Sequence, residues 1–203
     1  RRLQRQMCIR DRFGVSTAIL AGNSLLTIAF EILSQPSLKI DYKSKINLIS
    51  LLSKSAGHTG IAGGQYSDLK YEKKRKSFKK IVDMQINKTG KLFSFCCMAP
   101  VLLSKKNKYL KLFNSIGSKI GLLFQIADDL IDYSGSTKKA GKKTRKDSKK
   151  GKATLIGLLG YKNTVKYGNR LKLEILNKIK KFGKKNKDLS CLLYTSPSPR
   201  DDE

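Results

Sequence analysis

The sequence is poor in the residues from which several common functional sites are built. Only one of its 203 residues is histidine, His58, and no second histidine or acid stands at ligand spacing from it. We therefore expect His58 to be structural rather than a metal ligand or a catalytic base. The adjacent cysteines Cys96 and Cys97 fit neither the spacing of a zinc site nor that of a redox motif. We interpret the pair as small buried hydrophobes of a protein from a reducing compartment.

The sequence also lacks strand patterns and internal repeats. No stretch of useful length alternates apolar and polar residues, and we read no apolar run as long enough to cross a membrane, so we expect no stable membrane insertion. Apolar residues instead recur at helical spacing, and the sequence predicts an all-α fold. The predicted helices are Phe13–Ser34, Ile46–Asp68, Phe78–Leu103, Lys108–Leu130 and Thr164–Phe182. We expect the first to be a core helix and Phe124 in the fourth to face the core.

Acidic residues are scarce as well. The 43 lysines and arginines outnumber 15 aspartates and glutamates, which gives a net charge of +28. The excess is nearly all lysine, spread over many segments and not interleaved with aromatic residues as in an RNA-binding sheet. We therefore interpret it as a solvated surface and expect no nucleic-acid partner. The alternative is a basic helical DNA-binding protein, which predicts tight, salt-sensitive binding without any need for Mg²⁺ or diphosphate.

The two ends of the chain are related at the level of DNA. Residues 7–11, MCIRD, can be encoded by a DNA element whose reverse complement encodes CLLYT, the sequence of residues 191–195. Both peptides resemble a translated sequencing-library adapter. We therefore expect residues 1–12 and 191–203 to be tails of non-biological origin that flank a partial domain at 13–190. Different codons at these positions in the source DNA would contradict this interpretation.

What the sequence does contain is an apolar helix that carries acids at a fixed spacing. Residues 121–135 read GLLFQIADDLIDYSG. Asp128 and Asp132 are four residues apart and share a helix face, and Gln125 lies about one turn before Asp128. Carboxylates in this arrangement suit Mg²⁺, which takes oxygen ligands from one or two carboxylates, from substrate phosphates and from water. The alternative interpretation is a solvated acidic patch at a helix end.

Two further features favour the metal site. Acids are unfavourable near the negative end of a helix dipole unless a cation compensates them. The following segment is strongly basic, and residues 138–152 contain nine lysines and arginines, among them Lys142 and Lys152. A carboxylate cluster followed by a run of cations suits a phosphate ester or a diphosphate that is bound to a metal.

The same segment resembles the second aspartate-rich region of the trans-isoprenyl diphosphate synthases, the polyprenyl synthetase family. Its pattern is FQxxDDxxD, then Gly-Lys, then Asp, then Gly-Lys-x-Thr. Three more motifs of that family occur in chain order: an FGxxxAILAG helix from Phe13 to Phe30, GGQxxD from Gly63 to Asp68, and KTG from Lys88 to Gly90. The resemblance implies an isoprenoid synthase-type orthogonal helix bundle around a central cavity, incomplete at its N-terminus.

The resemblance further implies head-to-tail prenyl transfer of the farnesyl or geranylgeranyl type. In that reaction isopentenyl diphosphate attacks the cation formed when an allylic diphosphate ionises, and Mg²⁺ stabilises the departing diphosphate. By this resemblance three acids would hold Mg²⁺: Asp128, supported by Asp129 and Asp132. A homodimer and a cytoplasmic location are also implied by the family.

The remaining family residues can be matched one by one. Three lysines would contact the diphosphate oxygens: Lys88, Lys142 and Lys152. Thr89 and Gln125 would lie over the reacting carbons, where their oxygens stabilise the cation. Gln65 and Asp68 would line the same cavity.

The sequence also departs from the family. It contains neither the first aspartate-rich motif, with its arginine pair, nor the lysine, arginine and histidine that bind isopentenyl diphosphate. We therefore expect this polypeptide to be inactive by itself. Two alternatives stay open, a non-catalytic subunit of a synthase heteromer and an enzyme related to class I terpene cyclases or to the head-to-head condensing enzymes.

Overall fold

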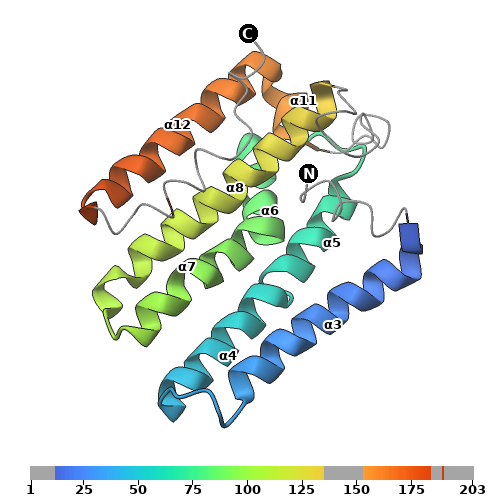
Figure 1. Ribbon diagram of the computed structural model, residues 1–203. Coiled ribbons are helices and arrows are strands. Elements are labelled where there is room, and N and C mark those ends of the chain that lie inside the picture. The colour runs from blue at the N-terminus through green and yellow to red at the C-terminus, as the bar shows by residue number, and fades with distance from the viewer. Residues whose placement is uncertain (1–11, 135–152, 184–188, 190–203) are drawn as a thin grey trace.

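The computed structural model describes residues 12–134, 153–183 and 189 (Figure 1). Every regular element among them is helical, which confirms the all-α class. The α-helices are α3 (Val15–Ser34), α4 (Tyr42–Ala56), α5 (Ile61–Tyr71), α6 (Phe78–Gln85), α7 (Lys91–Leu103), α8 (Leu110–Ser134), α11 (Leu155–Leu159) and α12 (Tyr161–Lys180). Neighbouring helices pack in the order α3, α4, α7, α8 and α12, and Figure 1 shows these long helices lying side by side.

Helix α8 is the centre of the core and packs between α7 and α12. Its buried residues recur at helical spacing and divide between two apolar clusters, which they share mainly with α6, α11 and α12. Phe124 was expected in this core but is 52% exposed. It lies two residues from both Leu122 and Ile126, so about 200° of helical rotation separates it from each of these buried side chains. Its ring contacts Phe93 of α7 instead, at 5.7 Å between centroids.

The predicted helix Ile46–Asp68 is wrong as a single element, because the chain breaks between Ala56 and Ile61. The break is a tight turn that only glycine fits. A Cβ on Gly60 would stand 1.9 Å from the carbonyl oxygen of Ser55. Gly60 therefore serves the turn between the two helices.

The predicted helix Phe78–Leu103 is continuous in path but contains one π-helical turn, η1 (Ile86–Gly90), between α6 and α7. This turn is packed between the backbones of two other helices. A Cβ on Gly64 of α5 would lie 2.1 Å from the backbone nitrogen of Lys88, and one on Gly121 of α8 would lie 2.5 Å from the Cα of Gly90. Single π turns of this kind occur often at functional sites.

Helix α3 differs from both expectations made for it. It is 20 residues long with a mean hydropathy of 1.5, so by length and composition it could cross a membrane, contrary to our reading of the sequence. Polar residues such as Asn23 and Ser24 interrupt its apolar run, so no continuous apolar stretch reveals the high mean hydropathy of the helix. It is not a core helix of the described chain either, since none of its residues is buried. One side contacts α4, and many large apolar side chains are exposed: Val15, Ile19, Leu20, Leu25, Leu26, Ile28 and Ile32.

The cysteine pair is not buried as expected. Cys96 is exposed and Cys97 is half-buried, and both are free thiols. Successive residues of a helix are rotated by about 100°, so two adjacent cysteines do not face one core together. Burial raises the pKa of the Cys97 thiol to about 11.

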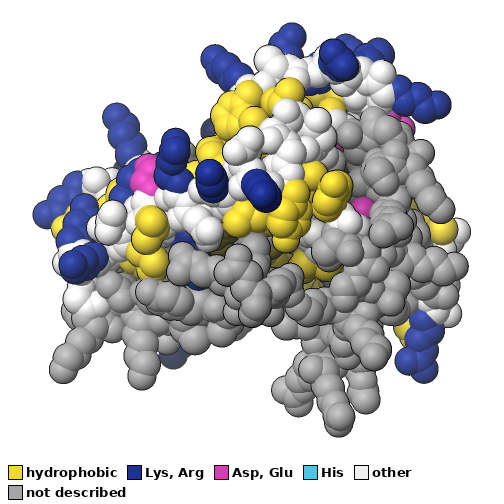
Figure 2. Space-filling model, turned by 90° about the horizontal axis from the view of Figure 1, so that it is seen from above, with side chains coloured by type: hydrophobic (Ala, Val, Ile, Leu, Met, Phe, Trp, Pro, Cys, Tyr) yellow, Lys and Arg dark blue, Asp and Glu magenta, His cyan; other side chains and the backbone are white. Residues whose placement is uncertain are grey.

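Basic side chains are scattered over the molecule. Figure 2 shows lysines and arginines spread across one face, separated by apolar and neutral groups rather than gathered into a single patch.

On α12 the buried positions follow one stripe, Thr164, Gly168, Leu171, Ile175 and Ile179. This arrangement agrees with the helix predicted at Thr164–Phe182 from its apolar spacing.

The glycine contacts at the π turn lead to a stability prediction. Gly64→Ala should lower the free energy of unfolding by about 1–3 kcal/mol or more, because the added methyl meets backbone atoms that have no room to move. Urea-induced unfolding of the whole protein, followed by circular dichroism, measures the change.

Gly22→Ala in α3 is the matched control. A Cβ at Gly22 meets nothing within 4 Å, so the change should be neutral or stabilise by up to about 1 kcal/mol. Equal effects of the two substitutions would contradict the close packing of α5 on the π turn.

Candidate functional site

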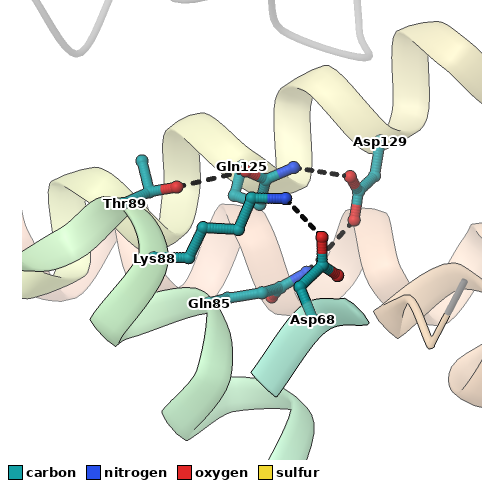
Figure 3. A network of polar contacts seen from close by, with 6 residues as sticks. All are labelled: Asp68, Gln85, Lys88, Thr89, Gln125 and Asp129. Carbon is teal, nitrogen blue, oxygen red and sulfur yellow. Dashed lines mark hydrogen bonds and ion pairs between the residues drawn. The ribbon is translucent and has the colours of Figure 1, made fainter. Parts of the chain in front are cut away.

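Polar side chains from separate helices meet next to the π turn (Figure 3). Helix α5 contributes Asp68, and α6 contributes its last residue, Gln85. The π turn carries two further residues of this network, Lys88 and Thr89. Helix α8 supplies the last two: Gln125 and Asp129. The close backbone packing described above brings these chain segments within hydrogen-bonding distance of one another.

One branch of the network is ionic. The Lys88 ammonium contacts the Asp68 carboxylate at 2.6 Å, and the two side chains are 23% and 8% exposed. A carboxylate this well buried needs a partner, because an unpaired charge in the protein interior is costly. An ammonium group has three donors, so the pair with Asp68 leaves Lys88 further capacity for an anion.

The other branch joins amides, a hydroxyl and a carboxylate. Thr89 Oγ1 donates to Gln125 Oε1 at 3.2 Å, and Gln125 Nε2 donates to Asp129 Oδ1 at 2.8 Å. Gln85 Nε2 donates to the second oxygen, Asp129 Oδ2, at 3.2 Å. Asp129 is only 5% exposed, so both oxygens of a buried carboxylate accept from amide donors.

A small polar cavity lies between the two branches. Its volume is about 20 Å³, room for about one water molecule. The residues that line it are Asp68, Met84, Gln85, Lys88, Gln125, Asp129, Ala153 and Thr154. The charged groups around it are one lysine and two aspartates.

The three acids of α8 do not occupy equivalent positions. Asp132 is 6% exposed and Asp129 is 5% exposed, whereas Asp128 is half-buried. All three take part in interactions. Within the described ranges, no cluster of three or more His, Cys, Asp or Glu residues forms a complete metal site. Carboxylate oxygens still fit Mg²⁺, which commonly takes only one or two protein carboxylates and completes its shell with phosphate oxygens and water.

The structure brings together five of the residues named from the sequence: Asp68, Lys88, Thr89, Gln125 and Asp129. Gln65 is exposed and is not among the residues that line the small cavity. Lys142 and Lys152 lie outside the described residues.

Sequence reasoning missed Gln85. It stands three residues before Lys88 in a segment predicted to be helical, and that spacing places two side chains near one helix face. Nothing in the sequence marked it as a partner of a residue 44 positions away.

The described chain has the all-α helix-bundle fold of the isoprenoid synthases. The chain matches the family model described as Polyprenyl synthetase over residues 1–192. It therefore belongs to the polyprenyl synthetase family.

Proteins of known structure are similar to this chain over more than nine-tenths of its length. A geranyltransferase from Helicobacter pylori, complexed with magnesium and isoprenyl diphosphate, is similar with a TM-score of 0.80 and 29% identity over 92% of this chain and 62% of that chain. An FPP/GFPP synthase from Zymomonas mobilis is similar with a TM-score of 0.77 and 30% identity, over 93% of this chain and 64% of that chain.

Curated relatives agree with these structures. A farnesyl diphosphate synthase of Micrococcus luteus is 33% identical over 90% of this chain, and one of Escherichia coli K12 is 32% identical over 89%. The chain spans 62% of the length of each of these two relatives.

The ionic branch of the site yields a prediction. Lys88→Met should lower the free energy of unfolding by about 1–3 kcal/mol, because it leaves the buried Asp68 carboxylate without its ammonium partner. Adding Asp68→Asn should recover part of the loss. The midpoint of urea unfolding measures both changes.

The exposed pair Lys105 and Asp41 provides the control. Its atoms are 3.8 Å apart and the side chains are 77% and 48% exposed, so Lys105→Met should cost less than about 1 kcal/mol. A similar cost at the two sites would contradict the view that burial makes the Lys88 pair important.

Proposed function

We propose that this protein is a Mg²⁺-dependent prenyltransferase that condenses isopentenyl diphosphate with an allylic diphosphate, as farnesyl and geranylgeranyl diphosphate synthases do. The observation that carries the proposal is the network in which the KTG motif on the π turn contacts the FQxxDD motif on α8. Two motifs of one family, 36 positions apart at their contact, meet in a single polar site.

Mg²⁺ is the proposed cofactor, and the carboxylates of Asp128, Asp129 and Asp132 would hold it. When bound, it neutralises charge on the diphosphate that leaves the allylic carbon. In the proposed site Lys88 supplies a fixed positive charge for the same diphosphate, and Asp68 orients the ammonium through their ion pair. Lys142 and Lys152 would add further cations in this proposal, and Asp68 and the exposed Gln65 would contact the substrate.

In this proposal the neutral side chains of Thr89 and Gln125 stabilise the allylic cation through their dipoles. The Thr89 hydroxyl donates to Gln125 Oε1, so the two oxygens lie together on one side of the network. Oxygen dipoles that are already fixed in place stabilise a developing positive charge without reorganisation. Gln125 is itself oriented by Asp129, which accepts from its amide nitrogen.

We assign this function to residues 13–190 and exclude residues 1–12 and 191–203, most of which lie outside the described residues. The proposal includes a cytoplasmic location.

The experiment is an assay of the whole protein, expressed from the complete gene recovered from the source DNA. Radiolabelled isopentenyl diphosphate, an allylic diphosphate and Mg²⁺ should give an acid-labile prenyl product, and its chain length is measured at the same time. Asp128→Ala should lower kcat by roughly 100-fold or more.

Asp83→Ala removes an exposed acid of α6 and is the matched control, which should retain full activity. Absence of product from the wild-type protein with every allylic length tested would overturn the proposal in favour of the non-catalytic subunit or the cyclase. Salt-sensitive DNA binding without product would favour the nucleic-acid alternative.

A homodimer is part of the proposal, and we assign its contact to α3. The exposed apolar side chains of this helix run over its whole length, and exposed apolar faces of this kind commonly mark protein interfaces. Leu25 and Ile32 are 68% and 50% exposed and, at seven residues apart, share one face.

Leu25→Glu together with Ile32→Glu should convert a dimeric whole protein into a monomer, as measured by sedimentation velocity. Lys166→Glu on exposed α12 surface is the control and should leave the dimer intact. A wild-type monomer, or a dimer that survives the double substitution, would contradict this interface.

A further inference from the structure

Gln85 is a buried amide that the proposed mechanism does not yet use. It is 3% exposed and is the last residue of α6, immediately before the π turn that carries Lys88 and Thr89. Its Nε2 donates to Asp129 Oδ2 at 3.2 Å, while its Oε1 is buried without a hydrogen-bond partner among the described residues. An amide that is only half satisfied costs the fold free energy, so an apolar residue of equal size would suit packing better.

The contact fixes more than Gln85 itself. Asp129 accepts from Gln85 on one oxygen and from Gln125 on the other. Two donors, one on each oxygen, fix the orientation of the Asp129 carboxylate. A carboxylate only accepts hydrogen bonds, so the nitrogen end of the Gln125 amide must face it. The nitrogen of Gln125 points to Asp129 and its oxygen therefore points to Thr89, as Figure 3 shows.

The contact also joins two elements of the site. Gln85 stands where α6 passes into the π turn, and Asp129 stands on α8. Their hydrogen bond therefore ties the start of the turn that carries the proposed catalytic residues to the helix that carries the acids. The ion pair of Lys88 with Asp68 makes a separate tie, to α5.

We propose that Gln85 is a positioning residue, which acts through Asp129 to hold the Gln125 amide and the π turn in the geometry that the reaction needs. This inference rests on the proposed prenyl transfer and deepens it. In this proposal Gln85 is present, despite an Oε1 that is unpaired among the described residues, because its N–H group orients Asp129. Asp129 in turn positions the Gln125 amide, in addition to any contact it makes with Mg²⁺.

The test uses the whole protein and requires that the wild type first forms prenyl product, so failure of the proposed function is seen separately. Gln85→Met keeps the length of the side chain and removes the donor. It should lower kcat by roughly 10- to 100-fold, the usual loss when a residue that orients a metal-site ligand is removed. The KM for isopentenyl diphosphate should stay within about two-fold, because a positioning defect acts on the chemical step.

The route through Asp129 is tested by a double-mutant cycle. In an Asp129→Asn background, Gln85→Met should change kcat by less than about two-fold, because the partner through which it acts is already altered. Independent, multiplicative losses in the double variant would overturn the proposal. Gln35→Met, at the exposed C-terminal end of α3, is the matched control and should leave kcat unchanged.

A readout without turnover separates positioning from binding and from folding. Mg²⁺ with inorganic diphosphate should raise the Tm of the wild type and of Gln85→Met by similar amounts, and should raise that of Asp128→Ala much less. Loss of the shift in Gln85→Met, or unfolding of that variant before ligand is added, would overturn the assignment and make Gln85 a ligand-binding or purely structural residue.

Discussion

The close approach of three backbones at the π turn is the constraint on which the site depends. Gly64 of α5 lies against the backbone of Lys88, and Gly121 of α8 lies against Gly90. Only helices without side chains at these points can come so near. The short distance lets side chains of ordinary length, such as Lys88 and Thr89, reach partners on the flanking helices.

The network separates two electrostatic tasks. A lysine paired with a carboxylate supplies charge for an anion, while hydroxyl and amide groups supply neutral dipoles close by. The proposed reaction, in which a diphosphate leaves and a carbocation forms, would use both groups, because it needs opposite potentials at neighbouring places. The π turn provides this arrangement because its consecutive residues Lys88 and Thr89 contact different helices. We connect the exposed face of α3 with assembly rather than with chemistry.

The sequence predicted the helical class and much of the site because both leave local signals. Helical spacing predicted α8 and α12, and the ordered motifs contain Lys88, Thr89, Gln125 and the acids. Boundaries were less accurate. Apolar spacing predicted one helix over Ile46–Asp68, although Gly57 and Gly60 form the turn between two helices. Spacing also placed Phe124 in the core, because apolar periodicity does not distinguish a core face from the face that carries a ring contact with Phe93.

The amino-acid sequence by itself determined which residues are available for the chemistry, since motif identity and helical periodicity are properties of the local chain. Tertiary structure decided how they are combined. The π turn, the ion pair of Lys88 with Asp68, and the hydrogen bond from Gln85 to Asp129 all form only in the folded protein. None of these follows from spacing, because each depends on which helix backbones approach one another, and contacts between residues 20 to 44 positions apart are fixed only when the helices pack.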